Sequence, residues 1–254
     1  MRSLRHLKKM LATWRGLVEV SISIGALRRA PNAPYWLPNK LLGAQKEPKY
    51  MLGEHRLLLI GGSSHVGKST LAQSLASHLR WNYCSTDKLA RHPGRPWQAK
   101  SKEIPKHVAD YYQLLSVDEL IEDVIHHYRK NVWLLIEDIV TFHATDTSSE
   151  KLVMEGSALL PESVITLNFD NIATIWLTAS NEFLRQRIYF ASQYETKSPY
   201  ERMLVDKFLE RNGLYNERII DAVNRLGLIS LNVEGASTVN ELMSMCLSAF
   251  VNNT

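Results

Sequence analysis

The sequence predicts an α/β protein with a parallel sheet at its centre. From residue 54 onward, apolar runs typical of buried strands alternate with stretches of helical periodicity, which is the pattern of parallel sheets whose strands are joined by helices. The chain has 254 residues, 45% of them hydrophobic and 22% charged, so it can bury a core of ordinary size as one domain with an extension. No apolar run in the sequence reaches the length of a membrane-spanning helix. The two cysteines exclude a disulfide scaffold and a multi-cysteine zinc site, and a cytoplasmic location is the default expectation.

The first 50 residues differ in composition from the rest of the chain. They carry ten Lys and Arg side chains against Glu19 and Glu47, whereas residues 51–254 hold 20 basic and 24 acidic side chains. The mildly acidic body therefore gives no general reason to expect a nucleic-acid partner. We expect residues 1–50 to be a basic, loosely structured leader that precedes one domain over residues 51–254. Three interpretations of the leader remain open: a non-structural extension or an over-long gene model, a basic helix that contacts a membrane surface or a partner, and an organelle transit peptide.

The predicted elements follow one another in a regular order. Strands are expected at residues 56–60, 81–85, 151–155, 173–177 and 228–233, and helices at 69–79, on either side of about residue 196, and from residue 238. After Arg56, the first strand is a continuous apolar run over residues 57–60, as in strands that are buried on both faces. After the second strand, prolines and a glycine in the loop over residues 89–104 end regular structure.

A helical region follows that loop. Apolar residues recur at three- and four-residue steps from Leu120 to Val140, which predicts one long amphipathic helix or two consecutive ones. Glu137 and Asp138 come after four apolar residues, as the paired acids of mechanical ATPases do. Because the periodicity is helical, we expect these two acids to lie on a solvated face instead.

The strongest motif stands directly after the first strand and directly before the first helix. Residues 62–69 read Gly-Ser-Ser-His-Val-Gly-Lys-Ser and match the pattern G-x-x-x-x-G-K-[ST]. The glycines let backbone N–H groups curl round a phosphate chain, and the helix N-terminus adds a positive dipole end. Lys68 should reach the β and γ phosphates, and the Ser69 hydroxyl should join the shell of a Mg²⁺ ion. ATP and Mg²⁺ are therefore the expected cofactors, bound by Gly62, Ser63, Ser64, His65, Val66, Gly67, Lys68, Ser69 and Thr70. His65 is expected to face solvent, with a contact to substrate as the alternative.

A phosphate-binding loop indicates a nucleoside triphosphate without saying what is done with it. A GTPase would need an Asn-Lys-x-Asp motif after a later strand, where residues 178–181 read Thr-Ala-Ser-Asn. The helical periodicity disfavours the mechanical ATPases. Small-molecule kinases of the nucleoside monophosphate kinase type account for more of the sequence, because charged residues follow the strand ends, where ligands gather in an open parallel sheet.

Asp87 directly follows the second strand. A carboxylate there can accept the proton of an attacking hydroxyl or hold that hydroxyl by a hydrogen bond. The alternative is that Asp87 caps a helix that begins at Lys88. Arg91 and Arg95 flank a Pro-Gly turn just beyond it, and two guanidinium groups on one loop suit a phosphate or carboxylate on the acceptor. Ordinary surface arginines are the alternative there.

The third strand ends in an acid followed by a glycine. Glu155 would lie where a carboxylate can bind a metal-bound water or the acceptor, and Gly156 would let the substrate approach the backbone. We therefore expect both residues to take part in acceptor binding, and Ser69 and Glu155 to hold the metal.

Two arginines follow the fourth strand, ahead of a polar loop over residues 193–201. This is the position of a lid, about residues 185–206, whose guanidinium groups neutralise the transferring phosphate. Because Arg185 and Arg187 are two residues apart on a helix, they cannot share a face, so one of them is expected to serve. We favour Arg187 as the catalytic residue, with a surface salt bridge as the alternative.

With these residues in view, the body resembles the P-loop small-molecule kinase group, and most closely proteins described as 2-phosphoglycerate kinase-like or zeta-toxin-like ATPases. The resemblance covers roughly residues 54–235 and depends on the phosphate-binding loop, Ser85-Thr-Asp87 and Met154-Glu-Gly156. It implies a three-layer P-loop sandwich with a five-stranded parallel sheet of order 2-3-1-4-5. It also implies a helical acceptor-binding insertion, about residues 88–146, and a lid. The match puts Lys68 and Ser69 in nucleotide roles and Asp87 in the acceptor role.

Together these features predict a kinase that uses ATP and Mg²⁺ to phosphorylate a hydroxyl of a small anionic metabolite. Lys68, Asp87 and Arg187 are the expected catalytic residues. A toxin kinase acting on a nucleotide sugar is a variant of this hypothesis. The alternative from another class is an ATP-binding regulatory module that contacts a partner protein and has no metabolite acceptor.

Overall fold

The computed structural model describes residues 52–90, 92–97 and 103–251. The predicted leader and Arg91 lie outside these residues.

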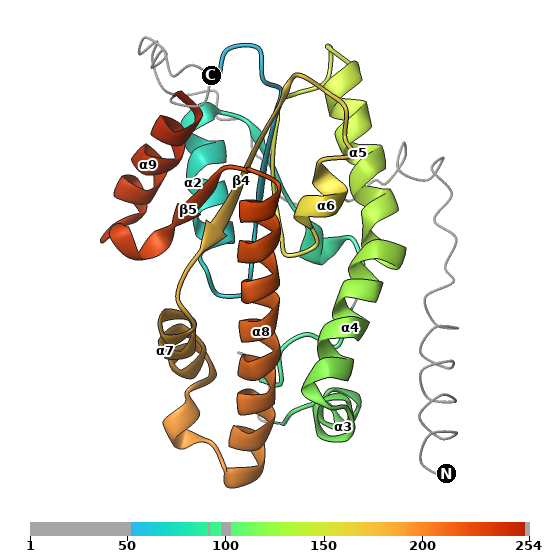
Figure 1. Cartoon of the computed structure of the whole chain (residues 1–254), viewed down its shortest axis with the longest axis vertical. Helices are drawn as coiled ribbons and strands as arrows, with labels where there is room; N and C mark the ends of the chain where they lie inside the picture. Colours follow the sequence, from blue (N-terminus) through green and yellow to red (C-terminus); the bar gives the residue numbers. More distant parts are fainter. Residues whose placement is uncertain (1–51, 91, 98–102, 252–254) are drawn as a thin grey trace. The chain divides into compact units, whose positions relative to one another are not determined.

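A five-stranded parallel sheet forms the centre of the described domain (Figure 1). The strands are β1 (Leu57–Gly62), β2 (Asn82–Ser85), β3 (Leu152–Glu155), β4 (Ile172–Thr178) and β5 (Ser230–Asn232), and they lie in the order β2-β3-β1-β4-β5. All pairings are parallel, so the predicted fold class and strand order are confirmed. In this register Glu155 of β3 lies between Ile60 of β1 and Ser85 of β2, which brings the carboxyl ends of three strands together.

Both faces of the sheet are covered by helices, and β1 shows why its sequence is continuously apolar. Leu58 and Ile60 point into a core formed with α2 (Lys68–Leu79) and α9 (Val239–Val251). Leu57 and Leu59 point into a second core on the opposite face. Because successive side chains of a strand alternate between faces, each face receives two fully buried residues of about 1.5–3 kcal/mol each.

The second core is made by the helices that precede β3, β4 and β5. These are α4 (Val117–His127), α5 (Trp133–Thr145), α6 (Pro161–Val164) and α8 (Pro199–Arg225), while α3 (Lys106–Leu114) packs against α8. A π-helical turn, Tyr128–Val132, joins α4 to α5 without a break, as the apolar periodicity predicted. Glu137 and Asp138 are exposed on α5, so the sequence-based expectation of a solvated face is confirmed.

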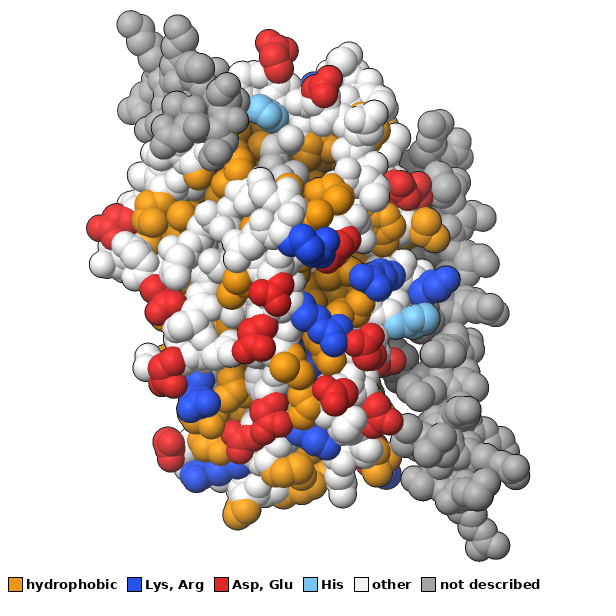
Figure 2. Space-filling model, viewed as in Figure 1, with side chains coloured by type: hydrophobic (Ala, Val, Ile, Leu, Met, Phe, Trp, Pro, Cys, Tyr) orange, Lys and Arg blue, Asp and Glu red, His pale blue; other side chains and the backbone are white. Residues whose placement is uncertain are grey.

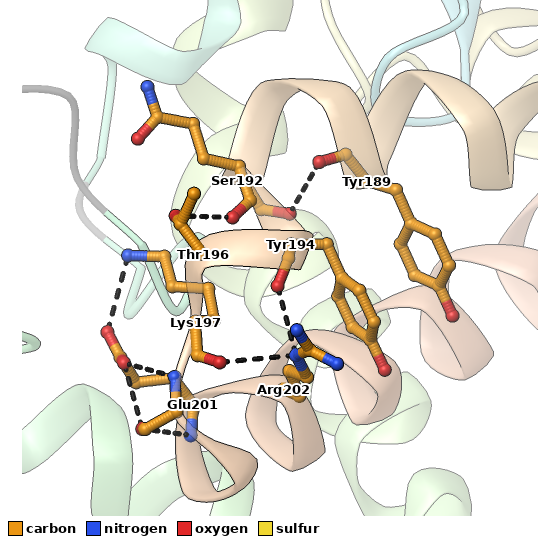
Figure 3. Close-up of polar contacts among 9 residues, drawn as sticks. Tyr189, Ser192, Tyr194, Thr196, Lys197, Glu201 and Arg202 are labelled. Carbon is orange, nitrogen blue, oxygen red and sulfur yellow. Dashed lines mark hydrogen bonds and ion pairs between the residues drawn. The ribbon is translucent and has the colours of Figure 1, made fainter.

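The segment expected to be a polar loop, residues 193–201, forms the turn of a helical hairpin between α7 (Asn181–Ser192) and α8, so helices lie on either side of residue 196 as predicted. The guanidinium group of Arg202 donates hydrogen bonds to the carbonyls of Tyr194, Glu195 and Lys197, and Figure 3 shows how it faces this turn. The rings of Tyr189 and Tyr194 stack with centroids 3.9 Å apart, and both hydroxyls donate to Asp206. The Arg202 hydrogen bonds satisfy backbone carbonyls of the turn, and Asp206 holds the two stacked tyrosines against α8.

The surface over α8 carries both signs of charge. Arg218 pairs with Glu122 of α4 at 2.7 Å, and Arg225 pairs with Glu162 of α6 at 2.8 Å. On the face seen in Figure 2, acidic and basic side chains are interspersed. Such exposed pairs contribute about 0–1 kcal/mol each.

Among the described residues, no helix is both long and apolar enough to cross a membrane.

Candidate active site

The P-loop, residues 62–69, has the backbone conformation that its glycines permit. Gly62 and Gly67 have φ values of 132° and 109°, which side-chain-bearing residues rarely adopt. A Cβ on Gly62 would lie 2.5 Å from the carbonyl oxygen of Leu177 in β4. The loop therefore sits tightly against the neighbouring strand and turns directly into α2, which begins at Lys68.

Lys68 is buried at the end of this loop, with 7% of its surface exposed. Its ammonium group donates a hydrogen bond of 2.7 Å to the carbonyl of Ser63. Burial lowers the pKa of Lys68 from its ordinary value, while Glu155 and Asp87 oppose that change. Lys68 thus supplies a positive charge held close to the loop and balanced by two carboxylates.

Glu155 lies at the end of β3 and is 2% exposed. Its Oε1 atom accepts hydrogen bonds from Ser69 at 3.1 Å and from Tyr83 at 3.0 Å. The structure therefore brings together the two residues expected to hold the metal. Sequence reasoning missed Tyr83, whose position inside β2 carried no signal for a site role.

Two asparagines of α8 hold the P-loop from the other side. The side chain of Asn212 accepts from the backbone N–H of Ser64 at 3.0 Å and donates to the same residue's carbonyl at 3.2 Å. Asn216, one turn later, accepts from the Ser63 hydroxyl at 3.0 Å and donates to Ala179 at 2.9 Å. Both asparagines are 2% exposed, so each is a buried amide whose hydrogen bonds go to this loop or to the end of β4.

Arg187 and Arg185 take different positions, as their spacing on α7 requires. Arg187 donates to the carbonyl of His65 at 3.3 Å and lies over the Phe183 ring at 4.4 Å. Arg185 is 54% exposed and pairs with Glu182 at 3.6 Å. The structure thus places Arg187, the residue favoured from the sequence, beside the P-loop.

Our expectation that His65 faces solvent is wrong. Its ring packs 5.6 Å from the ring of Trp97 and 6.1 Å from that of Phe208, measured between centroids. Burial, together with Arg95, Lys68 and Arg187, lowers the pKa of His65 to about 3. The expectation failed because the burial of His65 results from tertiary packing. Both aromatic partners come from segments that are distant from it in the sequence.

Two pockets meet at the carboxyl end of the sheet. The P-loop pocket is lined by residues that include Gly67, Lys68, Ser69, Thr70, Glu155 and Arg187. The α8 pocket is lined by residues that include Thr86, His127, Tyr128, Phe208, Arg211 and Tyr215. Ser64, Asp87, Arg95 and Ser157 line both. A ligand in one pocket would therefore lie against a ligand in the other.

Asp87 and Arg95 are the charged residues at this junction, and both are exposed. Asp87 lies inside a 3₁₀ turn, Thr86–Lys88, whose N-cap is Ser85. The alternative that Asp87 caps a helix is therefore wrong, since the turn begins one residue before it, at Thr86, and is capped by Ser85. Arg91, which is predicted to bind the acceptor, lies outside the described residues.

Arg211 is the main feature of the α8 pocket and was missed from the sequence. It is 7% exposed, and its Nη1 donates to the Tyr112 hydroxyl at 3.0 Å. Its guanidinium group lies 4.7 Å from the Phe208 ring centroid and 5.6 Å from that of Tyr112. Among the described residues no carboxylate forms an ion pair with Arg211. A buried positive charge of this kind is costly unless a ligand compensates it.

Two histidines line the same pocket, and both are held neutral. Burial, reinforced by the nearby His92, lowers the pKa of His127 to about 4. Burial also lowers the pKa of His92, whose Nε2 is 3.6 Å from Asp123. The Tyr111 hydroxyl donates to Asp123 at 3.0 Å. Because these imidazoles are neutral at physiological pH, Arg211 dominates the positive charge that this part of the pocket presents.

The missing side chain of Gly156 makes room for Thr86, and the expected approach of the substrate to its backbone stays a prediction. A Cβ at this position would lie 1.7 Å from the Thr86 hydroxyl oxygen. Thr86 is 2% exposed, and its hydroxyl oxygen has no hydrogen-bond partner among the described residues. This unpaired hydroxyl lines the α8 pocket next to Asp87, where a ligand could satisfy it.

Replacing Gly156 with Ala is expected to destabilise the fold. The added methyl would overlap Thr86 on a fully packed strand end, at a cost of about 1–3 kcal/mol in the free energy of unfolding. Urea denaturation followed by circular dichroism measures this cost. Gly53→Ala is the matched control, because nothing lies within 4 Å of its Cβ position. Equal stability of the two variants would contradict the packing described here.

The strand order, together with a P-loop that joins β1 to α2, defines a P-loop protein with a parallel α/β fold. No protein-family model matches the chain. Among curated proteins, the chain is similar to cytidylate kinase of Chlamydia caviae, with 44% identity over 48 residues, 17% of this chain and 22% of that protein. The chain thus matches about a fifth of the length of this relative.

Several solved structures are similar to the chain at low sequence identity. A gluconokinase from Sinorhizobium meliloti is 16% identical over 77% of this chain and 91% of that one, with a TM-score of 0.46. Shikimate kinase from Aquifex aeolicus is 16% identical over 78% and 97%, with a TM-score of 0.46. Deoxyadenosine kinase from M. mycoides is 14% identical over 76% and 98%, with a TM-score of 0.41. The fold class is established by this chain's own strand order and P-loop.

Proposed function

We propose that the protein is an ATP- and Mg²⁺-dependent kinase that transfers the γ-phosphoryl group to a hydroxyl of a small anionic metabolite. The observation that carries the proposal is the pair of adjoining pockets. One contains the P-loop and Lys68, the other contains the buried guanidinium of Arg211, and Asp87 lines both. This arrangement suits phosphoryl transfer between two bound ligands, because the reaction depends mainly on positioning and charge stabilisation.

The anionic character of the acceptor follows from Arg211. Its charge lies in a pocket whose other walls combine aromatic and aliphatic side chains with polar ones, among them Asp87 and Arg95. A carboxylate or phosphate of the acceptor would neutralise this charge and gain strength from the low local dielectric. Arg91, which belongs to the loop predicted over residues 89–104, is proposed to bind the acceptor as well.

Asp87 is proposed to receive the acceptor hydroxyl. The carboxylate lies at the junction of the pockets and can take the proton as the acceptor oxygen bonds to the γ phosphorus. The bond from the γ phosphorus to the bridging oxygen breaks, and ADP leaves. Lys68 and Arg187 stabilise the charge on the transferring group. The unpaired Thr86 hydroxyl, one residue before Asp87, would bind a second polar group of the acceptor.

The donor set beside the P-loop fits Mg²⁺. Ser69 and Glu155 offer hard oxygen ligands 3.1 Å apart, and Asp87 lines the same pocket. Within residues 52–90, 92–97 and 103–251, no group of three or more His, Cys, Asp or Glu side chains could hold a metal by itself. Mg²⁺ in kinases is held by one or two carboxylates together with substrate phosphates, so the set fits this ion. When bound, the ion would neutralise charge on the phosphates.

Glu155→Gln is expected to raise the Mg²⁺ concentration needed for half-maximal activity by about 10- to 100-fold. The amide can still accept from Ser69 and Tyr83, but it lacks the negative charge that attracts the ion. A Mg²⁺ titration of ADP release measures the change. Glu150→Gln is the control, since this exposed residue hydrogen-bonds Asn82 at 2.6 Å. An unchanged Mg²⁺ dependence in Glu155→Gln would exclude Glu155 from the metal site.

The experiment that tests the proposed function is ADP release from Mg²⁺-ATP by the full chain. The acceptor panel includes 2-phosphoglycerate, for the resemblance stated above, and gluconate, shikimate, deoxyadenosine and CMP, for the kinases to which the chain is similar. Stimulation by one compound, with a phosphorylated product, would establish the kinase and its acceptor. ATP binding without stimulation by any anionic hydroxy compound would instead favour the regulatory module, and the leader over residues 1–50 would then be tested for a partner.

A further inference from the structure

We propose that His65 is a positioning residue that couples the P-loop to residues 92–97, the segment that carries Arg95 between the two pockets. The inference deepens the proposed function, because it takes the α8 pocket as the acceptor site. His65, at a position of the P-loop motif where any residue is allowed, would then have a role other than binding phosphate.

The first support is the aromatic cluster around the His65 ring. Trp97 is 8% exposed and Phe208 is 1% exposed, and their ring centroids are 4.9 Å apart. The His65 ring contacts both. Trp97 ends the segment of Arg95, and Phe208 belongs to α8. The His65 ring thus joins three separate parts of the chain at one point.

The second support is the backbone of His65. Its φ of 66° is in the left-handed region, which non-glycine residues adopt infrequently. Its carbonyl accepts from Arg187 of α7, while its ring faces Trp97 and Phe208. One residue of the P-loop therefore contacts the proposed lid arginine through its backbone and the acceptor side through its side chain. Backbone strain of this kind persists where surrounding contacts over-determine it.

The third support is the chemistry of the ring. Nδ1 is hydrogen-bonded to the Ser64 hydroxyl at 3.2 Å, and Nε2 is buried without a partner among the described residues. With a pKa of about 3, the ring stays neutral near pH 7. His65 therefore acts through packing and not through proton transfer. A phenylalanine ring should substitute for it, whereas a methyl group should not.

Tryptophan fluorescence tests the coupling. Saturating Mg²⁺-ADP added to the full chain should change the emission of Trp97, because nucleotide that occupies the P-loop acts on the His65 ring. The change should disappear in Trp97→Phe and persist in Trp81→Phe, since Trp81 packs at the core beside α2. His65→Ala should lose most of the amplitude at saturation, and His65→Phe should retain most of it. Amplitude at saturation is independent of affinity, and calorimetry confirms that ADP is bound.

A wild-type chain that binds ADP without a Trp97-dependent change would overturn the inference. So would His65→Ala with full amplitude, or His65→Phe with as large a loss as His65→Ala. If the Trp97 change depends on His65 as expected but no acceptor is phosphorylated, only the proposed function fails, and the coupling through His65 stands. If an acceptor is phosphorylated while His65→Ala keeps the full amplitude, the inference fails and the kinase remains.

Discussion

Arg211→Met is expected to weaken acceptor binding strongly and, at the same time, to stabilise the fold. The acceptor KM should rise by a factor of 10² or more, about 3 kcal/mol in binding free energy. Without Arg211 the anionic group of the acceptor would be buried with no guanidinium to hydrogen-bond it, and an unpaired buried charge costs that much. The free energy of unfolding should increase by about 1 kcal/mol, because a buried charge without a carboxylate partner is removed. The substitution also removes the contacts of the Arg211 guanidinium with the Phe208 and Tyr112 rings. Their loss offsets part of this gain in stability. The Tyr112 hydroxyl stays paired, since it donates to the Gly94 carbonyl.

Steady-state kinetics and urea denaturation measure the two effects. Arg218→Met is the matched control on the same helix, because Arg218 is 48% exposed and forms a surface pair with Glu122. It should change neither quantity by much, since such a pair contributes about 0–1 kcal/mol. If Arg211→Met lowered stability and left acceptor kinetics unchanged, Arg211 would be a structural residue and the acceptor need not be anionic.

Lys68→Ala is expected to lower kcat by at least about 10²–10³-fold, the effect of removing one preorganised group that stabilises charge in the transition state. The loss falls on turnover because Lys68 is placed to bind the transferring phosphoryl group, whose charge develops during the reaction. The Lys68→Ala variant should remain folded, since the substitution removes a buried charge from the core. Single-turnover phosphoryl transfer, with circular dichroism as the check on folding, measures this.

Lys106→Ala is the control for Lys68→Ala. Lys106 is 86% exposed and pairs with Asp110 on α3, so its removal should leave turnover unchanged. A folded Lys68→Ala variant that kept its acceptor-dependent turnover would show that the P-loop lysine is not part of the reaction, and the proposed kinase would have to be abandoned.

Most of the fold could be predicted because its signals are local. The run Leu57 to Ile60 is apolar at every position, and both faces of β1 are buried. The apolar steps from Leu120 to Val140 predicted the continuous helical region that the structure contains. The strand order came from the resemblance and was confirmed by the pairings. The helices on either side of residue 196 were predicted correctly. The polar composition of the segment between them did not show that Arg202 would bind its backbone carbonyls or that Asp206 would accept from Tyr189 and Tyr194.

The residues that α8 contributes could not be located in the same way. Phe208, Asn212 and Asn216 recur every four residues and face the P-loop, while Arg211 and Tyr215 form the adjoining row toward the α8 pocket. Polar side chains at three- and four-residue steps are a weak signal of a binding site. The same helical sequence is compatible with side chains that contact a neighbouring element and with side chains that face water. Only their buried state, which depends on packing, separates the two cases.

The sequence by itself determined the P-loop, the alternation of strands and helices, and the acids that follow the strand ends, because each of these is specified by residues adjacent in the chain. The tertiary structure alone decided which side chains share a site. It brought Glu155 to Ser69, His65 to Trp97, and Arg211 to the pocket beside Asp87. The physical reason is that these contacts join segments separated by tens of residues, and their geometry depends on how helices pack on the sheet.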